Sequence, residues 1–172
     1  MTTRIVLTGS ESVGKTTLAA RLADQYGVEC VPEFVRDYAA QKGSALDFRD
    51  HGPIAFGQMA REDEYIARAG ALLIQDTDLL STVVYCHHYF GRCPAFIEEA
   101  AIVRQPSLYL LLDIDVPWVA DDVRDRGDRR DEVQELFTAT LARFNAPYVA
   151  IGGSWDARFD AACVAIDAQL AA

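Results

Sequence analysis

Short apolar runs alternate along the chain with longer stretches of amphipathic spacing. The runs have the length of β-strands, and several are apolar at successive positions, as is typical of strands covered on both faces of a parallel sheet. They occupy residues 5–8, 29–31, 72–75, 108–112 and 148–151. We therefore predict five parallel strands, of which the second has the weakest signal.

The segments between these runs favour helices, because apolar residues recur every three or four positions. The clearest examples are Leu18, Leu22 and Tyr26 in one segment and Phe159, Cys163, Ile166 and Leu170 in another. Alternating strands and helices with right-handed crossovers predict a three-layer α/β domain with its ligand site at the carboxyl ends of the strands. Because no repeat, linker or low-complexity tract interrupts residues 1–172, we expect a single domain.

Composition narrows the choice of partners. Sixteen Lys and Arg against 26 Asp and Glu give a net charge of −10, which disfavours broad binding to nucleic acid or to an anionic membrane. No segment approaches the roughly 20 apolar residues of a membrane helix, and no export signal precedes the first strand. The four cysteines are scattered, without a CxxC pair. We therefore expect a cytoplasmic protein with reduced thiols and a small-molecule substrate.

The strongest local motif lies directly after the first strand. Residues 9–16 fit the pattern GxxxxGK[ST], in which glycines let main-chain N–H groups surround phosphate oxygens at a helix N-terminus. Lys15 would reach the β- and γ-phosphates of a nucleoside triphosphate, and the Thr16 hydroxyl would bind Mg²⁺. The predicted ATP-binding residues are Gly9, Ser10, Glu11, Ser12, Val13, Gly14, Lys15, Thr16 and Thr17.

Two acids follow the buried run at residues 72–75. A phosphate-loop fold needs a carboxylate beside Thr16 to hold Mg²⁺, and we assign this role to Asp76. Asp78 either contacts the acceptor or caps the helix that begins there, since Asp is a common N-cap. The sequence does not choose between these two roles.

A second acid and a base follow the second strand at the same predicted sheet edge. Glu33 would bind ribose hydroxyls or take the proton of an attacking hydroxyl, and Arg36 would orient the acceptor or a product phosphate. The alternative is a surface ion pair at a helix start.

Residues 120–131 are rich in arginine and poor in apolar side chains, and we predict that they form a lid. Closing such a segment would bring Arg124 and Arg130 to the transferred phosphoryl group and would exclude water. The alternative is a solvated helix with internal ion pairs. Tyr89 and Trp118 either stack on a nucleoside base or serve as packing residues.

Taken in order, these motifs resemble the ribosylnicotinamide kinase domain of the bacterial NadR family, a branch of the P-loop nucleoside and nucleotide kinases. The resemblance spans nearly the whole chain. It rests on the phosphate loop, on the segments 33–36, 54–58, 76–78 and 89–91, on Pro117, Trp118, Val119, Asp121 and Arg124, and on the segment 148–152 with Arg158.

The resemblance implies a five-stranded parallel sheet in the order 2-3-1-4-5, with helices on both faces and a lid. It also implies transfer of the ATP γ-phosphate to the 5′-hydroxyl of nicotinamide riboside, yielding nicotinamide mononucleotide for NAD salvage. Lys15, Glu33, Asp76, Arg124 and Arg130 are then the expected catalytic residues, with either Glu33 or Asp76 as the base. Rival interpretations are a kinase for another nucleoside or nucleoside monophosphate, and a nucleotide-dependent switch that acts through a protein partner.

Overall fold

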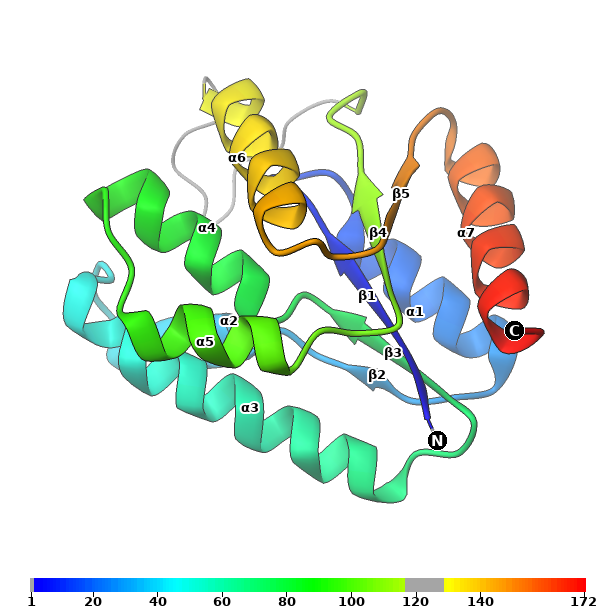
Figure 1. The fold of residues 1–172 in the computed structure, drawn as a ribbon, viewed down its shortest axis with the longest axis horizontal. Coiled ribbons are helices and arrows are strands. Elements are labelled where there is room, and N and C mark those ends of the chain that lie inside the picture. The colour runs from blue at the N-terminus through cyan, green and yellow to red at the C-terminus, as the bar shows by residue number, and fades with distance from the viewer. Residues whose placement is uncertain (1, 117–128) are drawn as a thin grey trace.

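The computed structural model describes residues 2–116 and 129–172, which form a five-stranded parallel sheet between two layers of helices (Figure 1). The strands are β1 (Thr3–Thr8), β2 (Cys30–Val31), β3 (Leu72–Asp76), β4 (Leu108–Leu112) and β5 (Tyr148–Ile151). Their order is β2-β3-β1-β4-β5. All five predicted strands and the predicted order are confirmed, and β2, the weakest signal, is the shortest strand.

Strand β1 lies at the centre of the sheet and sets the place of the loop that follows it. It pairs in parallel with β3, where Leu7 faces Asp76, and with β4, where Thr8 faces Leu111. Because all five strands run in the same direction, the loops after β1, β2 and β3 leave the same edge of the sheet. The predicted phosphate loop, Glu33 and Asp76 therefore meet there.

The helices were expected from amphipathic spacing, and the two clearest predictions are confirmed. The segment with Leu18 and Leu22 is helix α1, and the segment with Ile166 is helix α7. The helices are α1 (Lys15–Tyr26), α2 (Phe34–Lys42), α3 (His51–Arg68), α4 (Leu79–Phe90), α5 (Ala95–Val103), α6 (Arg130–Arg143) and α7 (Trp155–Leu170), with a 3₁₀ turn η1 (Phe48–Asp50) before α3.

Alternation along the strands divides the core into two layers, because successive side chains of a strand point to opposite faces. Ile5 and Leu7 of β1 point toward α1 and α7, where Leu22 and Ile166 are fully buried. Val6 points to the other face and joins a cluster built by α3, α4, α5 and α6. The sheet is thus covered on both faces, as its continuous apolar runs predicted (Figure 1).

Most of the predicted lid at residues 120–131 lies outside the described residues, and so do Trp118 and Arg124. Arg130 is described and is the first residue of α6. No helix in the described ranges has both the length and the apolar character needed to cross a membrane.

Candidate functional site

The phosphate loop joins the end of β1 to the start of α1. Gly14 adopts a left-handed backbone conformation with φ of 86°, and a Cβ at this position would lie 2.4 Å from the indole of Trp155. Both the torsion and the close approach require glycine. The Lys15 ammonium donates to the carbonyls of Gly9, at 3.0 Å, and Ser10, at 2.6 Å. The loop therefore curls around the side chain that is expected to meet the phosphates.

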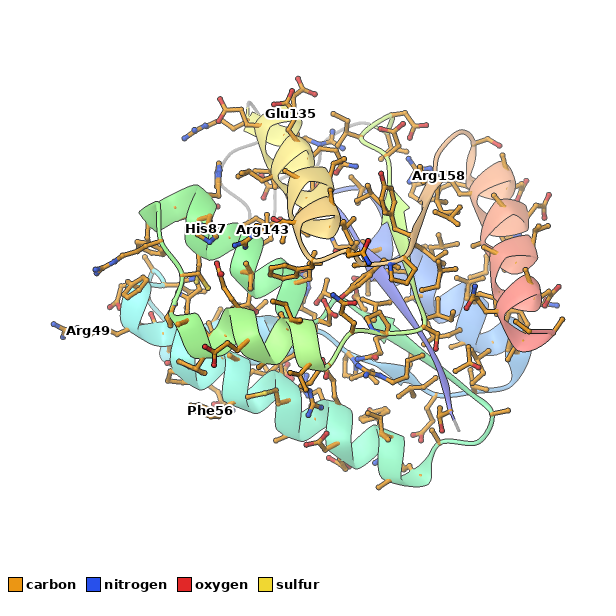
Figure 2. The ribbon with its side chains drawn as sticks, in the orientation of Figure 1. Arg49, Phe56, His87, Glu135, Arg143 and Arg158 are labelled. Atoms are coloured by element: carbon orange, nitrogen blue, oxygen red, sulfur yellow. The ribbon has the colours of Figure 1, made fainter. Side chains whose placement is uncertain are left out.

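Two side chains from other elements hold this loop in place. Gln134 of α6 accepts a hydrogen bond from the Ser10 N–H at 3.0 Å and donates to the Leu112 carbonyl at the end of β4. Arg158 of α7, labelled in Figure 2, is fully buried and donates to the Val13 carbonyl at 2.8 Å. The loop is thus tied to β4 on one side and to α7 on the other.

Arg158 holds more than the phosphate loop. Its guanidinium also donates to the carbonyls of Asp113 and Gly153, each at 3.0 Å, and forms an ion pair with Asp115. These acceptors follow β4 and β5. A single buried cation therefore connects the loops after three neighbouring strands.

The predicted magnesium ligands lie together beside the loop. The Thr16 hydroxyl donates to Asp76 Oδ2 at 2.6 Å. Asp76 Oδ1 is buried and has no hydrogen-bond partner among the described residues. Buried carboxylate oxygens are normally paired, so this atom is suited to bind a metal ion. In the described ranges no three or more His, Cys, Asp and Glu side chains cluster as a complete metal site. Mg²⁺ commonly takes one or two protein ligands and completes its shell with water and phosphates, so Thr16 and Asp76 fit it.

A cavity of about 940 Å³ lies beside the phosphate loop, between α2, α3 and α4. Its walls bring together most of the residues that the sequence assigned to the acceptor. The lining includes Lys15, Glu33, Arg36, Asp78 and Tyr89 from the prediction, together with His51, Ser81, Tyr85 and Phe90. The volume is in the range of small-molecule sites.

Glu33 and Arg36 form the ion pair that was one of the two interpretations of this motif. Arg36 Nε donates to Glu33 Oε2 at 2.8 Å, and both side chains line the cavity. Burial raises the pKa of Glu33 above its ordinary value, while Lys15 and Arg36 oppose this effect. Glu33 is therefore a carboxylate of increased basicity at the cavity wall, and its contact with an acceptor stays a prediction.

Helix α3 supports the turn that carries Glu33. The Phe34 ring lies against Gly57, where a Cβ would come within 2.1 Å of the ring. Gln58 accepts a hydrogen bond from the Phe34 N–H at 3.0 Å. Arg61 donates to the Glu33 carbonyl and lies over the Phe34 ring. Three residues of α3 thus hold the start of α2.

Asp78 caps α4, which is one of the two roles that the sequence left open. Its Oδ1 accepts from the Leu80 N–H at 3.0 Å, and its Oδ2 accepts from the Tyr109 hydroxyl at 2.6 Å. Burial raises the pKa of Asp78 to about 7. Asp78 also lines the cavity, so a contact with the acceptor remains a prediction alongside the cap.

Two other predicted residues are placed by the structure. Tyr89 stacks with Tyr85 at a centroid distance of 6.1 Å and is 38% exposed at the cavity wall. Arg130 donates to the Val116 carbonyl at 2.9 Å and lies beside the Ser12 carbonyl of the phosphate loop. Both positions are compatible with their predicted roles.

The sequence analysis missed residues that hold the phosphate loop and the start of α2 in place, and a histidine in the cavity wall. It assigned no role to Gln134, Arg61 or His51, which belong to no local motif. Arg158 and Gln58 belong to the segments on which the family resemblance rests, and this was the one signal that pointed to them. Their roles were not predicted, because Arg158 contacts a residue 145 positions away and Gln58 a residue 24 positions away.

The chain is similar to known proteins over most of its length. Residues 4–158 match the AAA domain family. Over 162 residues the chain is 32% identical to the trifunctional NAD biosynthesis/regulator protein NadR of Escherichia coli K12, and 31% identical to the NadR protein of Salmonella typhimurium. Each alignment covers 90% of this chain, which spans only 40% of the length of these relatives.

Solved structures show the same fold. A NadR protein in complex with NR superposes with a TM-score of 0.84 at 22% identity, covering 99% of this chain and 52% of the other. Thymidylate kinase from Candida albicans superposes with a TM-score of 0.71 at 15% identity, covering 98% of this chain and 92% of the other. These similarities establish a P-loop kinase fold.

Proposed function

Because the chain belongs to the AAA domain family and carries the site described above, we propose that it is an ATP-dependent kinase. Its acceptor is the 5′-hydroxyl of nicotinamide riboside (NR), and its product is nicotinamide mononucleotide. The observation that carries the proposal is that the phosphate loop opens directly onto the 940 Å³ cavity lined by Glu33 and Arg36. The similarity to NadR proteins, one of which was solved with NR, supports this acceptor.

The donor end of the site holds the triphosphate. The main-chain N–H groups of the phosphate loop bind phosphate oxygens, and Lys15 exchanges its bonds to Gly9 and Ser10 for the β- and γ-phosphates. Thr16 and Asp76 hold Mg²⁺, which supplies neutralisation of the charge on the phosphates. Gln134 and Arg158 keep the loop in the shape that this binding requires.

The acceptor end positions the hydroxyl for in-line attack. Either Glu33 or Asp76 accepts its proton, because the two carboxylates follow β2 and β3 at the same sheet edge and Glu33 interacts electrostatically with both Lys15 and Asp76. Arg36 and Asp78 bind the ribose or its substituents, and Tyr89 stacks on the base. Arg130, at the start of α6, stabilises the charge on the transferred group. Arg124 and Trp118 lie outside the described residues, and we keep for them the predicted roles at the transferred group and at the base. Catalysis is then mainly positioning and charge stabilisation.

A substrate screen tests the proposal. Purified protein with Mg²⁺ and ATP is incubated with NR, with the common nucleosides and with their monophosphates, and products are identified by mass. We expect a product from NR that is one phosphoryl group heavier. If only another nucleoside or a monophosphate gives a product, the proposed acceptor is wrong and the proposed kinase activity stands. ATP or GTP hydrolysis that ignores every acceptor and responds to a protein partner would favour a nucleotide-dependent switch instead.

Lys15→Ala tests the donor end of the site. Removing the ammonium should abolish phosphoryl transfer while the protein stays folded, because the ammonium donates hydrogen bonds to the loop carbonyls of Gly9 and Ser10 rather than to the core of the sheet. Arg49→Ala is the control for the loss of one positive charge away from the site, because Arg49 is exposed and points away from the molecule in Figure 2. Near-normal turnover by Lys15→Ala would contradict the proposed site.

A further inference from the structure

His51 lies in the wall of the acceptor cavity, at the first position of α3. Its side chain is buried, with 7% of the residue exposed. The ring packs edge-on against Phe90 at 5.3 Å and tilted against Phe48 at 6.4 Å. It is a polar residue that lines the cavity together with Leu46, Ile54 and Phe90.

The backbone before α3 fixes which ring nitrogen carries the proton. His51 Nδ1 lies 3.1 Å from the Asp47 carbonyl oxygen. A carbonyl oxygen accepts but never donates, so Nδ1 must be the N–H of the ring. Burial lowers the pKa of the His51 imidazole below its ordinary value, which favours the neutral ring. In neutral imidazole the second nitrogen, Nε2, is then a hydrogen-bond acceptor.

The cavity runs along α4 from the phosphate loop toward His51. Ser81, Thr82, Tyr85, Tyr89 and Phe90 form the α4 part of its wall. With a rise of 1.5 Å per residue, Ser81 and Phe90 are separated by about 13 Å along the helix axis. Ser81 lies beside Thr8, the last residue of β1 before the phosphate loop, whereas Phe90 contacts His51. The same cavity wall therefore extends from the phosphate loop, where the acceptor hydroxyl is proposed to lie, to His51.

We infer that His51 Nε2 accepts a hydrogen bond from an amide N–H on the acceptor's base and thereby selects a carboxamide over a carboxylate. The inference rests on the proposed function, because it concerns the same cavity. A carboxamide supplies the N–H that a neutral imidazole acceptor needs. A carboxylate supplies only lone pairs, which face the lone pair of Nε2 in a buried site. His51 is thus a specificity-determining residue rather than a participant in the transfer.

The test compares NR with nicotinate riboside, which carries a carboxylate in place of the carboxamide. We expect wild-type protein to prefer NR by roughly tenfold or more in kcat/KM. His51→Asn retains an amide donor for the Asp47 carbonyl and removes the acceptor at Nε2. It should lower kcat/KM for NR by roughly 10- to 100-fold, mainly through KM, and leave nicotinate riboside almost unchanged.

A matched variant and a modified substrate complete the experiment. His87→Asn replaces a histidine of α4 that pairs with Glu98 outside the cavity, and it should keep the wild-type preference. NR with a dimethylated carboxamide lacks the N–H donors but gains no charge, so wild-type protein should phosphorylate it poorly. This measurement tests the inference even where His51→Asn does not fold.

The outcomes separate the two proposals. Unchanged preference in folded His51→Asn, or equal use of NR and its dimethylated form by wild-type protein, overturns the role of His51 and leaves the kinase intact. No phosphorylation of NR by wild-type protein overturns the proposed function and, with it, the inference about the base.

Discussion

Replacing Arg158 with methionine removes the cation that joins the loops after three strands, and it should destabilise the protein severely. Methionine retains much of the aliphatic chain but leaves the carbonyls of Val13, Asp113 and Gly153 without their shared donor. It also leaves the Asp115 carboxylate without its partner. Breaking a buried ion pair costs about 3–5 kcal/mol. Because the Asp115 side chain is 36% exposed, water relieves part of this cost, and we expect a loss of about 3 kcal/mol.

Urea unfolding followed by circular dichroism measures this loss as a change in the free energy of unfolding. The lysine of Arg158→Lys keeps the positive charge but cannot reach all the acceptors of Arg158. The free energy of unfolding of this variant should therefore fall by about half as much as that of Arg158→Met. Arg143→Met is the matched control: its guanidinium pairs with Glu98, and its side chain is 49% exposed. Loss of such a pair should cost less than about 1 kcal/mol.

The same variant should weaken the binding of Mg²⁺-ATP, because Arg158 bonds the Val13 carbonyl directly before Gly14 and Lys15. Isothermal titration calorimetry at a temperature where the variant is folded gives the affinity. If Arg158→Met costs no more stability than Arg143→Met and binds Mg²⁺-ATP normally, the assignment of Arg158 as the support of the loop is wrong.

Two further substitutions test the acceptor side. Burial raises the pKa of Asp78 to about 7, so between about pH 4 and 7 the folded state holds a proton that the unfolded state has released. Stability should therefore fall as pH rises through this range, by at most about 1.4 kcal/mol per pH unit relative to Asp78→Asn. Urea unfolding at pH 5, 6, 7 and 8 checks this, and parallel profiles would contradict it. Gly57→Ala places a Cβ against the Phe34 ring and displaces the start of α2. It should raise KM for the nucleoside more than KM for ATP, and steady-state kinetics with equal effects on both would argue against the support by α3.

The sequence predicted the parts of the molecule whose signal is local. Apolar runs identified the strands, and the spacing of Leu18 and Leu22 identified α1, because burial on both faces and the helical repeat leave their mark on neighbouring residues. The glycines and Lys15 identified the phosphate loop, because its residues are contiguous in the sequence. The order of the strands came from the family resemblance, since periodicity says which segments are strands but not which ones pair.

The rest depends on contacts between distant segments. Val13 and Arg158 are 145 residues apart, and no pattern near either residue indicates that they meet. His51 has the same difficulty, because its tautomer follows from the position of the Asp47 carbonyl and not from its residue type. The two roles of Asp78 were left open because a cap and a ligand contact need the same residue at the same place. The role of Arg124 stays a prediction.

The position of the Lys15 ammonium changes how nucleotide binding should be understood thermodynamically. It already donates hydrogen bonds to two main-chain carbonyls, so these bonds must break before the ammonium can bind a triphosphate. Binding is a competition between phosphate oxygens and the loop's own carbonyls for the same protons. The heat released on association therefore reports the difference between two sets of hydrogen bonds, and it understates the strength of the new set.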